Sequence, residues 1–257
     1  MSAYLLFTLG APIASFGTVA VGERRPTWDR PSKSQVIGLV AGCLGIERRE
    51  SERQQALVAS LGFAVRIDDA GTLATDYHTT QTPKVPRIKE WVKANGPIRT
   101  RADELAVDDL KTILSQREFR MGSCYTVCLW LKAAGPASLQ DMRDKLCEPV
   151  FAPFAGRKAN ALMLPMRPLV VEAADLGGAF AAFDAEATPE MTMLWSELKF
   201  APKGHDLIFA DAEGIAPTQP IARLEERRDI PESRDKWRFG LRSEVLLRKP
   251  ATTGETA

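Results

Sequence analysis

The sequence has few of the side chains that metal sites and many hydrolytic sites use. Its 257 residues include two histidines, His78 and His205, and four cysteines that form no CxxC pair, so a zinc site is poorly supported. No GxxxxGKS/T motif is present, and no GxGxxG follows the first predicted strand, which argues against a nucleotide-hydrolysing enzyme. We therefore expect no metal and no other cofactor.

Long apolar runs are also missing. None approaches the roughly 18 residues that a membrane span needs, and the apolar start, residues 1–17, lacks the basic residues of a secretory signal. Reduced, unpaired cysteines are typical of the cytosol. We expect a cytoplasmic protein with no membrane partner.

An excess of charge of one sign is missing too. The 34 lysines and arginines face 33 aspartates and glutamates, which leaves a formal net charge of +1. Such a chain has no global field to attract nucleic acid. Any anion-binding site must therefore come from local clustering of basic residues.

The apolar pattern predicts an α+β fold. The expected elements, in chain order, are strand 3–9, helix 32–45, helix 50–62, strand 63–68, its hairpin partner 71–81, strand 123–131 and helix 138–149. Leu5, Phe7 and Leu9 share one face of the first strand, which Gly10 and Pro12 are expected to end. The order matches a ferredoxin-like or RNA-recognition-motif domain with an insertion.

The chain is expected to divide into two regions. Residues 1–165 would form the ferredoxin-like domain, and the polar, proline-bearing stretch 82–116 would be an excursion from it with a short helix at 87–95. Residues 166–257 are predicted to form a smaller, irregular, β-rich region packed on the core, with a frayed tail at 251–257.

The clearest candidate site is the start of the helix at 32–45. Arg24, Arg25, Arg30 and Lys33 lie just before it or in its first turn, and Ser32 or Ser34 can cap it. Helix N-termini expose N–H groups and a partial positive charge, which suits a phosphate. The alternative is a solvated basic loop ahead of a helix packed tightly on the sheet, and the residues alone leave both open. Glycines at 38, 42 and 45 would let a strand or a ligand approach, and the last is a plausible helix stop.

Two further stretches combine basic or aromatic groups. Tyr77 is a stacking group beside His78, which could act as a general base or simply be a hydrogen-bonded structural residue. Arg157 and Lys158 follow Gly156 and form either a clamp on a nucleic-acid backbone or an ordinary surface turn.

Five segments together resemble a known family. They are "YLLFTLGAPIASFG", "RPTWDRPSKSQVIGLVAGCLGI", "FAVRID…DYHT", "REFRMGSCYTVCLWL" and "EPVFAPFAGRKANALMLP". The chain resembles the Cas-five family, in particular its members in the type I-E CRISPR surveillance complex, Cascade. The resemblance is specific over 4–79 and 117–165 and weak in the excursion and the C-terminal third.

The resemblance implies a fold and a set of partners. The fold would be a repeat-associated (RAMP-type) ferredoxin-like domain whose thumb is the segment 82–116. Such subunits grip the 5′ handle of the CRISPR RNA (crRNA), cap the foot of the backbone filament in antiviral defence, contact the CasC backbone subunit and the large CasA subunit, and meet target DNA only indirectly. The RNA-binding residues we expect on this basis are Arg24, Arg25, Arg30, Ser32, Lys33, Ser34, Gln35, Tyr77, His78, Thr79, Arg87, Lys89, Arg117, Arg120, Arg157 and Lys158.

The same resemblance bears on catalysis. Relatives in another subtype cut precursor crRNA with a tyrosine, lysine and histidine set, but the thumb and its exit, "ILSQREFRMG", contain no histidine. We therefore expect a non-catalytic protein. The alternative is a metal-independent endoribonuclease in which His78 is the base and Tyr77 or a nearby lysine assists attack by a 2′-hydroxyl.

Overall fold

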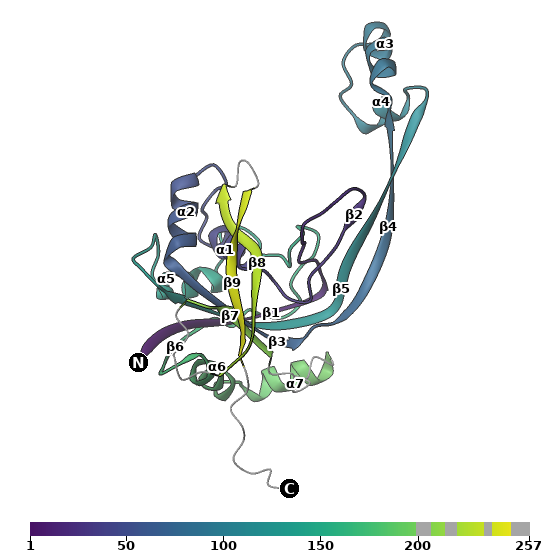
Figure 1. Cartoon of the computed structure of the whole chain (residues 1–257). Helices are drawn as coiled ribbons and strands as arrows, with labels where there is room; N and C mark the ends of the chain where they lie inside the picture. Colours follow the sequence, from purple (N-terminus) through teal and green to yellow (C-terminus); the bar gives the residue numbers. More distant parts are fainter. Residues whose placement is uncertain (199–206, 214–219, 234–237, 248–257) are drawn as a thin grey trace. The chain divides into compact units, whose positions relative to one another are not determined.

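The computed structural model describes residues 1–198, 207–213, 220–233 and 238–247 (Figure 1). The chain separates into two compact units. The first unit comprises 1–16, 28–72 and the described part of 120–257, and the second comprises 17–27 and 73–119. The predicted excursion, 82–116, lies within the second unit.

The first unit is built on one large antiparallel sheet with strand order β6-β1-β5-β3-β7-β9-β8. Its strands are β1 (Ser2–Ala14), β3 (Leu61–Asp69), β5 (Leu110–Leu131, of which only the later part belongs to this unit), β6 (Leu169–Ala173), β7 (Leu207–Asp211), β8 (Ile221–Ser233) and β9 (Arg238–Leu247). Its helices are α1 (Lys33–Cys43), α2 (Ser51–Ser60), α5 (Leu139–Cys147), α6 (Leu176–Ala185) and α7 (Pro189–Glu197).

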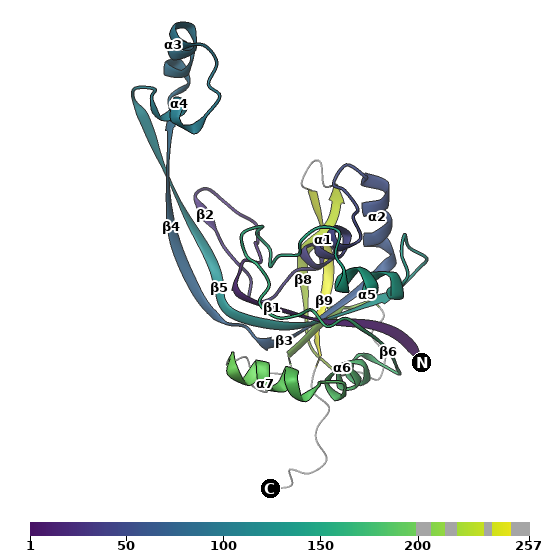
Figure 2. The same ribbon diagram turned by 180° about the vertical axis from the view of Figure 1, so that it is seen from behind.

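Helices cover both faces of this sheet (Figures 1 and 2). On one face, Leu5, Phe7 and Leu9 of β1 join a core with apolar residues of α1, α2 and α5, as their predicted shared face implied. On the other face, Tyr4 and Leu6 pack with residues of α6. Alternate residues of β1 are thus buried on opposite sides, because a strand turns successive side chains to opposite faces.

The first strand is longer than predicted. It continues past Gly10 and Pro12 to Ala14, and Gly10 pairs with Cys124 of β5. A Cβ at Gly10 would collide with the side chain of Leu164, so the glycine is needed for packing rather than for a break. β6 pairs only with the first part of β1, and the segment 163–166 continues along the same edge, where Thr8 N donates to Met166 O at 2.7 Å and Met163 N donates to Gly10 O at 2.9 Å.

The signals predicted at the ends of α1 are confirmed, because Ser32 caps this helix and Gly45 follows it with a φ of +74°. Ser138, for which no cap was predicted, caps α5. The positive φ explains the glycine at 45, because most L-residues are strained there.

The second unit is a long hairpin with a helical tip. β4 (Thr72–Pro83) pairs with the outer part of β5, and β2 (Arg24–Arg25) pairs with β5 in parallel. The tip carries α3 (Val85–Asn95), close to its predicted place, and α4 (Arg101–Leu105). The predicted pairing of β4 with the preceding strand, β3, is wrong. The 22-residue β5 is long enough to pair with β1 and β3 at one end and with β4 at the other.

The C-terminal third is more regular than predicted. It contributes β6, β7, β8 and β9 to the main sheet, together with α6 and α7, and Arg66 of β3 binds Asp184 of α6 at 2.7 and 2.9 Å. The predicted frayed tail and His205 lie outside the described residues.

Candidate nucleic-acid interface

The first turn of α1 is bound by a carboxylate from the far end of the chain. Ser32 and Gln35 form a capping box, in which Gln35 Oε1 accepts a hydrogen bond from Ser32 N at 2.9 Å. The next N–H, that of Lys33, donates to Oδ2 of Asp229 in β8 at 3.0 Å. Helix N-termini attract anions. Here the anion is the chain's own aspartate.

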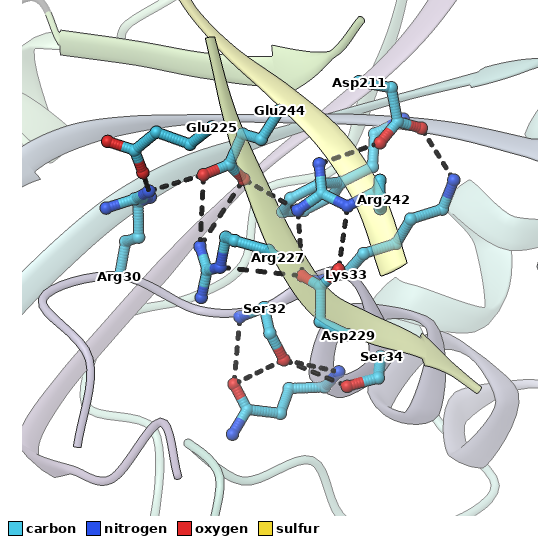
Figure 3. A network of polar contacts seen from close by, with 12 residues as sticks. Arg30, Ser32, Lys33, Ser34, Asp211, Glu225, Arg227, Asp229, Arg242 and Glu244 are labelled. Carbon is cyan, nitrogen blue, oxygen red and sulfur yellow. Dashed lines mark hydrogen bonds and ion pairs between the residues drawn. The ribbon is translucent and has the colours of Figure 1, made fainter. Parts of the chain in front are cut away.

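Asp229 belongs to a cluster of charges that joins α1 to the last three strands (Figure 3). We call this the buried ion-pair cluster; its members are Arg30, Lys33, Asp211, Arg227, Asp229, Arg242 and Glu244, all of them buried. Lys33 Nζ lies 2.6 Å from Asp211 Oδ2. Arg242 bridges three carboxylates, at 2.9 Å to Asp211, 2.8 Å to Asp229 and 2.7 Å to Glu244.

Glu244 is the point where the arginines meet. It accepts a short hydrogen bond from Arg30, and its Oε2 lies 3.4 Å from Nη1 of Arg227. The half-buried Glu225 adds a further negative charge at 3.6 Å from Arg30. The four cations therefore face four carboxylates, which is the balance that burial of charge requires.

Each arginine of the cluster also lies against an aromatic ring. The guanidinium carbon of Arg30 is 3.5 Å from the centroid of Phe209, and that of Arg242 is 5.5 Å from the Phe63 centroid. Arg227 lies 4.8 Å from the ring of Trp28. Guanidinium groups stack well on such rings because they are planar and weakly hydrated.

Burial and pairing compete in setting the ionisation of the cluster. Burial opposes the charged form of Asp229, but the hydrogen bond and the charge of Arg242 outweigh it and lower the pKa of Asp229. Burial likewise opposes the charge of Glu244, and Arg227 and Arg30 together lower the pKa of that carboxyl. Burial lowers the pKa of Lys33, although Asp211 partly counteracts it.

This geometry corrects the expectation for the helix start. Arg30, Ser32, Lys33 and Ser34 were predicted to contact phosphate, but all four are buried, and Lys33 is only 3% exposed. The N–H of Lys33 and both of the charged side chains already bind carboxylates. Cations that are buried and paired with carboxylates are not accessible to RNA, so these residues instead hold β7, β8 and β9 to α1. Gln35 is half-buried and is used in the helix cap.

Other predicted residues of the first unit meet at the end of β1. Arg120 pairs with Ala14 in the sheet, and its Nε donates to the carbonyl of Trp28 at 3.2 Å. The turn that carries Arg157 and Lys158 packs beside them, because Ser15 N donates to Ala155 O at 3.1 Å. At Gly156 the φ is +86° and a Cβ would collide with the carbonyl of Ser15. The turn is therefore fixed against β1, and Lys158 is exposed on it.

In the second unit, β2 places two arginines beside β5. Arg24 aligns with Gln116 and Arg25 with Arg117. Arg24 forms an ion pair with Glu118 at 3.1 Å, whereas Arg25 donates to the main-chain carbonyl of Gly22. The charge of Arg25 is therefore less neutralised than that of its neighbour.

The predicted aromatic site lies on the adjoining strand, β4. Tyr77 is 67% exposed, and its hydroxyl accepts a hydrogen bond from Gln116 Nε2 at 2.8 Å. His78 Nε2 is 2.7 Å from Asp76 Oδ2, and Thr79 is exposed. The strands thus bring Tyr77 to the part of β5 that pairs with β2.

The helical tip of the second unit carries the remaining predicted residues. Arg87 and Lys89 are exposed on α3, and Arg87 forms an ion pair with Glu90 at 2.8 Å. No contact among the described residues joins them to Arg25 or to Tyr77.

Sequence reasoning missed the carboxylate half of the cluster and the position of Trp28. A signal for the cluster was present in β8 and β9. Arg227 and Asp229, and likewise Arg242 and Glu244, alternate along strands as buried residues do, but with charged side chains. Alternating charged side chains can face the protein interior only where side chains of opposite charge neutralise them.

Neither a metal centre nor a membrane-spanning helix is found among the described residues. In the described ranges no group of three His, Cys, Asp or Glu side chains is placed to hold a metal ion. No described helix has both the length and the apolar character to cross a membrane.

Comparison with known proteins bears on all but the ends of the chain. A family-level sequence model described as "CRISPR-associated protein (Cas_Cas5)" matches residues 4–243. The chain belongs to the Cas5 family of CRISPR-associated proteins. This agrees with the resemblance that its motifs carry.

Individual relatives of this Cas5-family chain agree with that assignment. It is 26% identical over 219 residues to a protein of Escherichia coli (strain K12) named "CRISPR system Cascade subunit CasD", over 81% of this chain and 90% of that one. Among solved structures, "CRISPR RNA-guided surveillance complex" matches 96% of this chain and 91% of its counterpart with a TM-score of 0.59 at 23% identity. A second, "Crystal structure of Cas protein", has a TM-score of 0.54 at 23% identity and covers 95% of both chains. The two structures support the mixed α/β fold with its large antiparallel sheet.

Proposed function

We propose that this chain is a non-catalytic, RNA-binding subunit of a type I-E Cascade complex. It would grip the 5′ handle of the crRNA and cap the foot of the backbone filament, in contact with CasC and CasA. The observation that carries the proposal is the match to an E. coli Cascade subunit over 81% of this chain and 90% of that one. The exposed basic and aromatic groups on β2, β4 and β5 supply the chemistry.

Strand order supports a ferredoxin-like core within this proposal. Along the chain the order is β1, the helices α1 and α2, β3, β5, the helix α5 and β6. In the sheet these four strands lie in the order β6-β1-β5-β3. A βαββαβ sequence with its fourth strand beside its first is the ferredoxin-like arrangement. RNA-recognition motifs, which use a four-stranded sheet of this kind, stack bases on exposed aromatic side chains.

The second unit supplies the main RNA contacts in this proposal, and its tip would be the thumb. Arg25 and Arg117 lie side by side where β2 meets β5, and Tyr77 reaches the same part of β5 through Gln116. Basic groups neutralise phosphates and an exposed ring stacks a base, so together they suit single-stranded RNA. In the first unit, Arg120 and Lys158 would supply basic groups of their own for the RNA backbone.

The surroundings of His78 and Tyr77 differ from the tyrosine, lysine and histidine set that the resemblance associates with cleavage. The imidazole pairs with Asp76, and the Tyr77 hydroxyl is engaged by Gln116. A general base must reach the proton that it removes, with a partner that activates the attacking group. Neither side chain has a lysine as a hydrogen-bond or ion-pair partner in the part of the chain described.

The test is binding and cleavage of handle RNA by the purified full chain. Fluorescence anisotropy with the handle RNA and a scrambled RNA of equal length, in EDTA, should show tighter binding of the handle and no cleavage. Co-purification with CasC should then depend on the handle. Equal affinity for both RNAs would contradict handle recognition, and site-specific cleavage in EDTA would establish the endoribonuclease alternative.

A further inference from the structure

Trp28 lies at the surface in a setting that leaves it little freedom. Its side chain is 40% exposed, although tryptophan is among the largest apolar side chains of the protein. Both main-chain groups are held, because Trp28 N donates to Phe16 O at 2.8 Å and Trp28 O accepts from Arg120 Nε at 3.2 Å. The residue is therefore fixed at the end of β1.

Buried charges hold the indole from within. The guanidinium carbons of Arg227 and Arg30 lie 4.8 and 6.0 Å from the ring centroid, and both arginines are bound to Glu244 in the buried ion-pair cluster. A ring packed against cations that cannot move cannot easily turn inward. The cluster thus serves as a rigid base for an aromatic surface that remains exposed.

Basic residues lie near Trp28 on neighbouring segments, and the adjoining acidic group, Asp29, is paired with Arg30 at 2.9 Å. Arg120 touches its carbonyl, and the turn with Arg157 and Lys158 packs on Ser15, one residue before Phe16, which accepts the hydrogen bond of Trp28. An exposed ring with basic groups beside it is the combination that binds single-stranded nucleic acid, because bases stack while phosphates are neutralised.

We propose that Trp28 is a base-stacking site for one unpaired nucleobase of the bound RNA. Arg120 and Lys158 bind the adjoining phosphates. The inference rests on the proposed RNA-binding function and adds a contact in the first unit, at a residue that is not among the predicted RNA-binding residues. Preorganisation makes the contact efficient, since the ring loses little freedom on binding.

Stacking predicts a specific pattern of affinities. Trp28→Ala should weaken binding of the handle RNA about tenfold, the order expected for one base–aromatic stack. Trp28→Phe and Trp28→Tyr should restore most of it. The dependence of affinity on salt should stay unchanged in all three variants, because no charge is removed. Arg120→Ala, by contrast, should reduce the salt dependence.

Two further measurements separate stacking from a purely structural role. The difference in fluorescence between parent and Trp28→Phe isolates the signal of Trp28, and handle RNA should quench it. Trp195→Phe, a substitution in α7, is the matched control. Handle RNA should quench the fluorescence of this variant as it quenches that of the parent, because Trp28 is still present. An RNA with one abasic position at the stacked nucleotide should bind the parent about tenfold more weakly than intact RNA does. The two RNAs should bind Trp28→Ala equally well, because that variant has no ring to stack on.

The outcomes distinguish this inference from the function on which it rests. If the parent does not bind handle RNA, both are wrong. The stacking site alone is wrong if the parent binds handle RNA and three further results are found together. Trp28→Ala binds as tightly as the parent, no abasic position is coupled to Trp28, and the fluorescence of Trp28 is not quenched. Quenching by CasC or CasA without RNA, with no quenching by RNA, would likewise overturn it and make Trp28 a protein contact. Should Trp28→Ala fail to fold, the quenching and the Phe and Tyr variants still decide.

Discussion

The main-chain N–H of Lys33 donates a 3.0 Å hydrogen bond to Oδ2 of Asp229, although 196 residues separate the two in the chain. The bond ties the start of α1 to β8 and occupies the position where a phosphate was expected. The side chain of Lys33 and the other carboxylate oxygen of Asp229 extend the same network to Asp211 and Arg242.

The first prediction concerns the stability of this joint. Asp229→Ala should lower the free energy of unfolding by about 3–5 kcal/mol, because it leaves the N–H of Lys33 without its acceptor and the buried ion-pair cluster with one uncompensated positive charge. Urea unfolding would measure the change. Glu226→Ala, an exposed residue of β8, is the matched control and should change stability by less than about 0.5 kcal/mol. Equal changes in stability for Asp229→Ala and Glu226→Ala would mean that the contact between α1 and β8 does not stabilise the protein.

The second prediction is a loss of stability in acid. The pKa values of Asp229 and Glu244 are lower in the folded state than in the unfolded chain, so their contribution is fully present above the unfolded values of about 4. It is lost as the pH falls through the lower folded values. Urea midpoints between pH 7 and pH 3 should therefore fall less steeply for Asp229→Asn than for the parent. Parallel profiles would contradict the role of this carboxyl.

The third prediction separates RNA contacts from structural cations. Arg25→Ala and Arg117→Ala should each weaken binding of handle RNA and reduce its salt slope by about 0.7, the value for one contact to single-stranded nucleic acid. Lys33→Ala should instead lower stability and leave the slope unchanged. The exposed Arg49, between α1 and α2, provides a control in Arg49→Ala. A reduced slope for Lys33→Ala in a folded protein would restore the phosphate interpretation of the helix start.

The fourth prediction concerns the tip of the second unit. Replacing 84–109 with a short Gly/Ser turn keeps β4 and β5 and removes α3 and α4. The shortened chain should melt at the parent's temperature but assemble poorly with crRNA and CasC, as judged by co-purification. Arg87→Ala with Lys89→Ala removes charge without removing length and shows which of the two matters. Normal assembly of the shortened chain would show that the tip is dispensable.

The fifth prediction concerns the thiols. Burial raises the pKa of Cys43 to about 11 and also raises those of Cys124 and Cys128, whereas Cys147 is exposed. One thiol should therefore react quickly with Ellman's reagent at pH 8, and Cys147→Ser should abolish that phase. All four should react in denaturant. Fast reaction of a second thiol in the native protein would show that one of the buried sites opens.

Features that depend on neighbours in the chain could be predicted from the sequence. The cap at Ser32, the stop at Gly45 and the inward face of Leu5, Phe7 and Leu9 all follow from residues within one or two turns or along one strand. The motifs that identify the family are local as well. Capping, backbone strain and alternation act over short distances, so they can be read without the fold.

The roles of the charged residues were decided only by the tertiary structure. Lys33 and Arg30 have the composition of a phosphate site, and nothing near them in the chain shows that Asp211, Asp229 and Glu244 come to lie against them. The partner of β4 was likewise set by the length of β5, not by the hairpin-like sequence beside it. A basic side chain attracts any anion in reach, and only folding determines whether that anion is an internal carboxylate or remains to be supplied by a ligand.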